Sequence, residues 1–285
     1  MEDSVSSFDY SDYNFIVEFP TCNSFRQILE FLNQNHKIIP LIFSKNKVSV
    51  RKANDKNIIL FDGIIHAHNL TLYYIDESIL IKPEEGEGND GEEKNEPEFF
   101  IHVPIHPLLI NLKRSQKKQK IRLSQKKGNE SFLIIHSDDS SGMSSDIRLE
   151  PTKKSPDNYK FYGDIVSENP NITMQLSGFY FSSTGCGRIS DRVSKIRAYK
   201  KGVKIFSTST QGDSIIQKGN CSGDFICEIK LSGDIMKSIS KLASLCDESI
   251  VRIYCDNEDY IRLEIPISVI GTAYLYLMTK DFSVE

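Results

Sequence analysis

Positive side chains crowd into one short stretch of this sequence. KRSQKKQKIRLSQKK, Lys113–Lys127, carries eight basic residues in fifteen positions and no acid. The whole chain of 285 residues has 35 basic and 39 acidic residues, a formal net charge of −4. Clustered lysine and arginine bind phosphate oxygens, so the stretch predicts a surface for a polyanion such as nucleic acid. A solvated helix and hairpin is the alternative, and Lys126 and Lys127 equally fit a turn tip beside Gly128.

An acidic segment balances this charge elsewhere in the chain. EEGEGNDGEEKNEPE, Glu84–Glu98, holds eight acids and one lysine, a local charge of −7. It has no apolar residue, so we expect a solvated loop. The rest of the chain is therefore slightly basic, at +3.

The sequence offers no pattern for bond chemistry. None of the motifs GxSxG, P-loop, HExxH or GxGxxG occurs. His102 and His106 have HxxxH spacing, but Pro104 lies between them and no third ligand follows. We expect no catalytic residue, no metal site and no cofactor, and hence a protein that is not an enzyme.

Cysteine usage and hydropathy suggest an intracellular protein without a membrane segment. The six cysteines show no CxxC pairing, which fits reduced thiols better than a disulfide framework. No apolar run approaches the roughly 20 residues that a membrane helix needs. The N-terminal MEDSVSSFDYSDYNF lacks a signal-peptide pattern.

Four stretches have helical periodicity. In CNSFRQILEFLNQN (22–35) and HPLLINLKRSQKK (106–118), apolar residues recur on one side and polar or basic residues fill the other. SGDIMKSISKLASLC (232–246) repeats the pattern, with Lys237 and Lys241 opposite its apolar stripe. SGFYFSSTGCGRISD (177–191) is weaker because Gly185 and Gly187 disfavour a helix interior.

Short strands make up most of the remainder. Runs rich in β-branched and aromatic residues occupy 44–52, 57–75, 120–125, 131–137, 171–178, 194–210, 225–232, 249–255 and 260–268. Helices and strands do not alternate strictly, so the pattern predicts an α+β fold. The polar, proline-containing segment 149–164 separates two similar halves and indicates a linker.

Three stretches together match the pattern of one protein family. SFRQILEFLNQN followed by VSVRKANDKNIIL opens the match, and SGFYFSSTGCGRISDRVSKIRAYKKGVKIFS continues it without a gap. YIRLEIPISVIGTAYLYLMTKDFSVE completes it with two strands and a tail. In order and spacing these stretches resemble the sliding clamps of the proliferating cell nuclear antigen (PCNA) family, over residues 14–285 apart from the acidic loop.

The resemblance implies an α+β DNA clamp fold of two similar domains, each with two helices packed on antiparallel sheets. It implies an acidic N-terminal extension (1–13), a first clamp domain (14–148) with the acidic loop 84–98, an interdomain linker (149–170) and a second clamp domain (171–285). A homotrimeric ring would enclose duplex DNA in a hole lined by helices and hold it without reading its sequence. The residues expected on the lining are Arg26, Lys113, Arg114, Lys117, Lys118, Arg188, Lys237 and Lys241. Ser182, Ser183 and Gly185 depart from the arginines that the family commonly places on its third helix.

The resemblance also implies a docking groove for a short helical partner motif with an aromatic plug. Its walls would be Ala53, Asn57, Ile58, Tyr162, Gly163, Ile165, Leu277, Met278 and Thr279. Met278 as a core residue is the alternative. Subunits would join through edge strands at Asp146, Ile147, Arg148 and Leu149 and at Asp213, Ser214, Ile215 and Ile216.

The expected partners are double-stranded DNA, DNA polymerase, a clamp loader and other proteins with short clamp-binding motifs. The expected function is that of a processivity factor in DNA replication and repair. Abundant Asn, Lys, Ile and Ser suit an AT-rich genome, so the expected location is the nucleus or the cytoplasmic factory of a large DNA virus.

Two other hypotheses remain at this point. A clamp-fold relative could act as a checkpoint or viral accessory subunit, in a heteromer or outside a ring. An unrelated α+β scaffold could bind single-stranded nucleic acid through the basic hairpin. The native mass distinguishes a homotrimeric sliding clamp from a heteromeric or non-ring relative. The dependence of binding on DNA topology distinguishes a ring from a scaffold that binds single-stranded nucleic acid directly.

Overall fold

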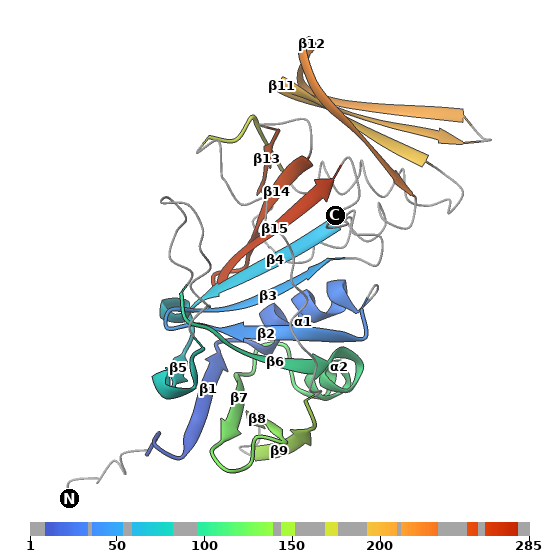
Figure 1. The fold of residues 1–285 in the computed structure, drawn as a ribbon. Coiled ribbons are helices and arrows are strands. Elements are labelled where there is room, and N and C mark those ends of the chain that lie inside the picture. Colours follow the sequence, from blue (N-terminus) through green and yellow to red (C-terminus); the bar gives the residue numbers. More distant parts are fainter. Residues whose placement is uncertain are drawn as a thin grey trace, which may run out of the picture.

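The computed structural model describes residues 9–33, 36–53, 59–81, 96–138, 144–151, 169–175, 193–209, 212–232, 250–255 and 260–278. Fifteen strands and two α-helices lie in these ranges, with two short 3₁₀ turns at Ala67–Asn69 and Glu77–Ile79. The strands form three sheets (Figure 1).

The two helices form where the apolar period predicts them. Helix α1 spans Cys22–Leu32 and buries Phe25, Ile28, Leu29 and Leu32, the expected stripe. Helix α2 spans Ile105–Arg114 and buries Leu108, Leu109 and Leu112. Neither described helix is long and apolar enough to cross a membrane. The expected helices at 177–191 and 232–246 lie almost wholly outside the described residues.

A five-stranded antiparallel sheet comes entirely from the first half of the chain. Its strand order is β5-β1-β7-β8-β9. The bounds are Leu72–Ile75 (β5), Tyr13–Phe19 (β1), Ile121–Lys126 (β7), Leu133–Asp138 (β8) and Ser144–Leu149 (β9). Strand β9 forms one edge of this sheet.

An eight-stranded sheet joins the two halves. Its order is β10-β13-β14-β15-β4-β3-β2-β6. The bounds are Ile172–Gln175 (β10), Ile250–Tyr254 (β13), Tyr260–Ile267 (β14), Gly271–Met278 (β15), Ile59–His66 (β4), Lys47–Ala53 (β3), Ile38–Phe43 (β2) and Phe99–Pro104 (β6). The joint between the halves is the antiparallel pair β4–β15, which runs from Ile65↔Gly271 to Ile59↔Leu277. One sheet therefore continues across both halves.

The main core packs α1 against both of these sheets. Phe25 of α1 stacks on Phe19 of β1 with ring centroids 4.5 Å apart, and Phe31 of α1 meets Phe61 of β4 at 5.2 Å. Phe15 of β1 stacks on Phe43 of β2 at 4.3 Å, which joins one sheet to the other. Such aromatic contacts stabilise beyond the burial of their area. α1 thus sits in the angle between the sheets.

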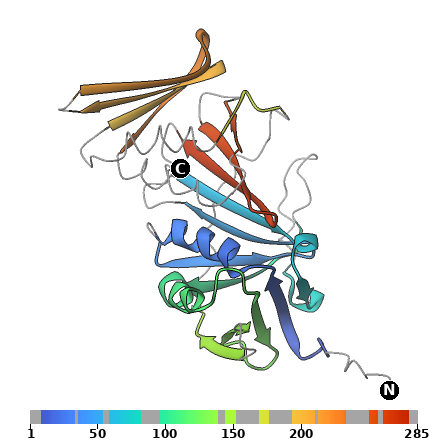
Figure 2. The same cartoon turned by 180° about the vertical axis from the view of Figure 1, so that it is seen from behind.

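The third sheet is a ribbon of two long strands, β11 (Val193–Ser209) and β12 (Gly212–Ser232), which we call the arm. It lies beyond β13 in Figures 1 and 2. Gly202 and Gly219 are directly opposed in this ladder, close to a register shift between Tyr199 and Lys201. A Cβ on Gly219 would lie 2.3 Å from the Lys201 carbonyl oxygen, and its φ is +75°, so this position requires glycine.

Three strands form where no strand was expected. They are β1 (YNFIVEF), β2 (IIPLIF) and β6 (FFIHVP). β2 is almost entirely apolar and buried, and such a run lacks the alternation that marks a half-exposed strand. The run expected at 194–210 corresponds to β11, and the run expected at 225–232 lies within the longer strand β12. The expected α+β class is confirmed, whereas the domain boundaries stay predictions.

The joint between the halves generates a prediction about stability. A Cβ on Gly271 would lie 2.0 Å from the Ile64 carbonyl oxygen of β4, so Gly271→Ala must push β15 away from β4. We expect the free energy of unfolding to fall by about 1–3 kcal/mol, measured by chemical denaturation. Gly223→Ala is the control, because no atom lies within 4 Å of the added Cβ there. Equal stability of the two variants would contradict the close approach.

Candidate functional site

Helix α2 and the loop after it are fastened to the start of α1. The backbone N–H groups of Cys22 and Asn23 donate to the carbonyl oxygens of Gln119 and Lys117, at 2.6 and 3.1 Å. The Cys22 thiol donates to the Leu112 carbonyl at 3.3 Å. These bonds satisfy donors that a helix N-terminus otherwise leaves unpaired. Figure 2 shows the two helices side by side. The loop that carries Lys117 is therefore held at a fixed place beside α1.

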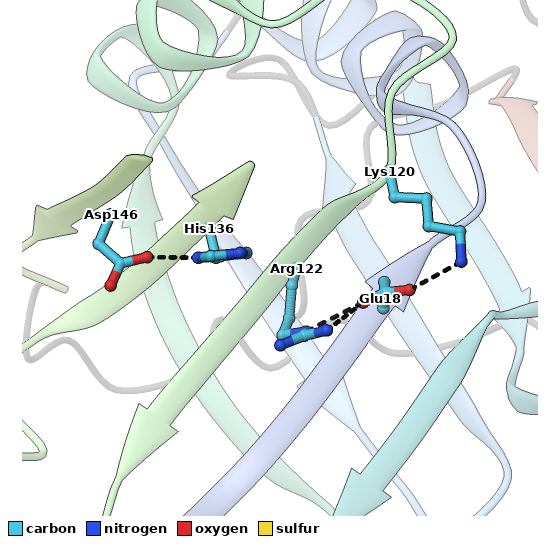
Figure 3. Close-up of polar contacts among 5 residues, drawn as sticks. All are labelled: Glu18, Lys120, Arg122, His136 and Asp146. Carbon is cyan, nitrogen blue, oxygen red and sulfur yellow. Dashed lines mark hydrogen bonds and ion pairs between the residues drawn. The ribbon is translucent and has the colours of Figure 1, made fainter. Parts of the chain in front are cut away.

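Half of the basic segment Lys113–Lys127 serves the structure of the sheet. Arg122 donates to Glu18 through Nε and Nη2, at 3.0 and 2.6 Å, and Lys120 Nζ lies 3.4 Å from the same carboxylate (Figure 3). Glu18 is buried, so this pairing offsets the cost of desolvating its charge. Lys127 pairs with Asp76 at 2.5 Å, and Lys126 lies over the Tyr13 ring.

The other half of the segment remains available for a ligand. Lys113, Arg114, Lys117 and Lys118 are all exposed. None of them forms an ion pair with any residue in the part of the chain that the structure describes. They follow one another from the last turn of α2 into the fastened loop, so their charge is concentrated at the end of α2. The structure thus separates the binding candidates from the structural cations.

Arg26 is less available to a ligand than its position on the polar side of α1 suggests. Its side chain is only 14% exposed and forms an ion pair with Glu30 at 3.4 Å, one helical turn away. Its Nη2 also donates to Asn23 Oδ1 at 3.3 Å. A DNA contact by Arg26 stays a prediction, and it would have to compete with Glu30. The other expected contacts, Arg188, Lys237 and Lys241, lie outside the described residues.

A row of polar side chains crosses the five-stranded sheet to its edge strand β9. Glu18, Arg122, His136 and Asp146 face one another across β1, β7, β8 and β9 in register. His136 Nδ1 lies 2.5 Å from Asp146 Oδ1, which ties β8 to β9 (Figure 3). Opposite charges on directly opposed positions stabilise a pairing register. The register of the edge strand is thereby set.

Both expected subunit-contact segments lie on strands with an open side. Asp146, Ile147, Arg148 and Leu149 belong to β9, and Asp213, Ser214, Ile215 and Ile216 belong to β12. Within the described ranges neither strand has a second partner on its outer side. The Ile215 side chain on β12 is 63% exposed. Open strand edges of this kind can pair with a strand from another chain.

Two of the residues expected on the docking groove lie in a small buried aromatic cluster. Ala53 and Met278 are buried together with Leu60, Tyr260 and Tyr276, separately from the main core. Leu277 lies in the main core instead, because successive side chains of β15 point to opposite faces of the sheet. Leu277 and Met278 therefore share no surface. Asn57, Ile58, Tyr162, Gly163, Ile165 and Thr279 lie outside the described residues.

Polar side chains beside this cluster were not expected from the sequence. The Arg262 guanidinium lies 3.9 Å from the Tyr254 ring centroid and is almost wholly buried. Tyr254 Oη donates to Glu264 at 2.8 Å, and burial together with this carboxylate raises the pKa of Tyr254 to about 12. The period-two spacing of Tyr260, Arg262 and Glu264 was a usable signal, since it places all three on the face opposite the core.

The pairing of Lys127 with Asp76 predicts a pH dependence. Hydrogen bonds from Lys127 and the Ser78 backbone lower the pKa of Asp76 from 3.8 to about 2. A carboxyl group with a lowered pKa stabilises the fold above its unfolded pKa and loses this contribution as pH falls toward the folded value. Asp76→Asn should therefore be less stable than the wild type at neutral pH, with the difference shrinking between pH 3.8 and about 2.

Urea denaturation across this pH range measures the effect. Lys127→Ala removes the same contact, so the double variant should lose less than the sum of the single variants. A difference between wild type and Asp76→Asn that does not change with pH would contradict the pairing.

Comparisons with known proteins complete the description. No protein-family model matches the chain, and no curated protein matches it. Among solved structures, a PCNA from Entamoeba histolytica matches with a TM-score of 0.72 at 12% identity, covering 93% of this chain and 98% of that chain. The PCNA2–PCNA3 complex from Sulfolobus tokodaii matches with a TM-score of 0.70 at 14% identity, covering 92% and 98%. The chain therefore has the fold of the PCNA clamps.

Proposed function

We propose that this chain is a subunit of a ring-shaped sliding clamp that encircles duplex DNA. The observation that carries the proposal is the eight-stranded sheet that runs unbroken across both halves through β4 and β15. A chain that joins its own halves by strand pairing can join a second copy in the same way, through the open sides of β9 and β12. Repetition of such a head-to-tail contact closes a ring when the rotation permits.

The charge distribution supports duplex DNA as the enclosed ligand. Lys113, Arg114, Lys117 and Lys118 lie exposed beside the two packed helices. Lysine and arginine contacts to phosphates position a protein on DNA without reading bases. A clamp that must move along any sequence needs contacts of this kind. Its work is non-enzymatic, since it holds other proteins near their substrate and raises their effective concentration.

The docking role belongs to the aromatic cluster around Ala53 and Met278. Tyrosine rings and an adaptable methionine suit a short helix that inserts an aromatic side chain. DNA polymerase, a clamp loader and repair enzymes with short clamp-binding motifs are the proposed partners. The nucleus, or a cytoplasmic viral factory, is the proposed location.

A heteromeric clamp is the second candidate. One similar structure is the PCNA2–PCNA3 complex from Sulfolobus tokodaii. A chain of this fold could therefore close a ring with another subunit, for instance in a checkpoint or viral accessory role. Native mass spectrometry of the purified chain separates the two: a homotrimer gives three chain masses, and a heteromer subunit gives one until its partner is added.

Retention on circular DNA tests the enclosure itself. After loading, the ring should stay on a closed circle and leave once the circle is cut. If the protein stays on the DNA after the circle is cut, the proposal is overturned in favour of direct binding.

The two groups of lysines provide matched variants. Lys113→Ala with Lys117→Ala removes exposed, available charges, whereas Lys120→Ala with Lys127→Ala removes structural ones. We expect the first pair to weaken duplex binding and to reduce the slope of log affinity against log salt by roughly one per lysine, with assembly intact. The second pair should lower the free energy of unfolding and leave the slope unchanged. Equal slopes for both pairs would place the DNA on another surface.

A further inference from the structure

The arm has one buried face and one exposed face. Ile196, Ala198, Val203 and Ile205 of β11 and Cys227 and Ile229 of β12 belong to the main core. The opposite face carries a patch of alternating cations and rings. This arm patch consists of Arg197, Tyr199, Lys204, Phe206 and Phe225.

Contacts across the fold of the ribbon assemble the arm patch. The Arg197 guanidinium lies 4.9 Å from the Phe206 ring centroid, and Lys204 Nζ lies 5.9 Å from that of Tyr199. These pairs join the two halves of β11 across Gly202, so the halves lie against each other. Tyr199 is in register with Phe225 of β12, and their rings meet edge to face at 6.0 Å. Three strand segments therefore contribute to one surface: both halves of β11 and the second half of β12.

The arm is positively charged although the chain is acidic. Residues 193–232 contain seven basic and three acidic residues, a net charge of +4 within a chain of −4. Glu228 neutralises part of this charge, since it pairs with Arg197 at 2.5 Å and Lys195 at 3.5 Å. Lys200, Lys201, Lys218 and Lys230 are exposed and form no ion pair with any described residue. Of these four, Lys230 lies on the face of the arm patch, because it is in register with Lys195, which shares a face with Arg197.

An exposed aromatic ring on this surface needs a physical reason. Phe225 is 56% exposed, and no described apolar residue covers its outer side. A nucleobase stacked on Phe225 would remove that area from water, while neighbouring lysines would bind the phosphates. Duplex DNA cannot supply such a base, because its bases are stacked on each other. An acidic peptide supplies the charge, but it offers a flat ring only where it carries an aromatic side chain, whereas every nucleotide carries one.

We propose that the arm patch binds single-stranded nucleic acid on the face of the arm opposite the core. Tyr199 and Phe225 stack bases, and Lys204 and Lys230 contact the backbone. Every base has a stacking face, so binding is independent of sequence. In the proposed clamp this site lies on a different surface from the helices, so a displaced or unpaired strand and the enclosed duplex are held separately.

Fluorescence anisotropy with a labelled oligothymidylate of about 20 nucleotides tests the proposal on the full chain. Phe225→Ala with Tyr199→Ala should weaken binding on the order of tenfold or more. Phe225→Tyr keeps a stacking ring and should retain wild-type affinity. Both positions are partly or largely exposed, and an unchanged native mass and circular dichroism spectrum confirm that each variant is folded.

Lys113→Ala with Lys117→Ala is the control for binding at the helices. It should leave oligothymidylate affinity unchanged while weakening duplex binding. Failure of the proposed single-strand site is therefore distinguishable from failure of the proposed clamp function. Loss of oligothymidylate binding in this variant alone would overturn the proposal. Absence of binding by the wild type, or equal binding by the alanine variants of Phe225 and Tyr199, would also overturn it. Displacement by polyglutamate that does not depend on the two rings would assign the arm to an acidic protein instead.

Discussion

The antiparallel pairing of β4 with β15 is the contact on which the rest of the structure depends. It joins strands that lie more than 200 positions apart in the sequence, and it makes one sheet of two halves. Backbone groups on both strands are satisfied by each other, so neither strand is left as an open edge inside the chain. The close approach at Gly271 shows how tightly the two backbones meet. Without this pair the main core would separate into two smaller ones.

Ion pairing decides which of many lysines can act on a ligand. Glu18 and Asp76 take up Arg122, Lys120 and Lys127, and the sheet gains register from these bonds. What remains exposed is a compact group at the end of α2. The arm follows the same pattern, since Glu228 pairs with two cations and the other lysines stay exposed. Local charge counts are therefore poor guides until the partners of each cation are known.

Local patterns in the sequence were sufficient for α1, α2 and the alternating strand β14, because a helical or period-two stripe depends only on nearby residues. They were insufficient for β2, whose uniform apolar run carries no period. The sequence could not predict that Lys113 is exposed without an ion pair to a described residue whereas Lys120 pairs with Glu18. Glu18 lies 104 positions from Arg122 in the sequence, and only the pairing of their strands brings it to this segment. The alternation of side chains along β15 was sufficient to predict that Leu277 and Met278 lie on different faces of the sheet. Placing both residues in one groove by resemblance to the family ignored this alternation.

The unequal lengths of two ladders have a mechanical consequence. The ladder within the chain has seven paired positions between β4 and β15, whereas in the proposed ring β9 has six residues with which to pair a neighbouring copy. Strain on the proposed ring would therefore open the contact between subunits before it opens the subunit itself. A protein that opens such a ring would thus separate the subunits from one another, and each subunit would keep its fold.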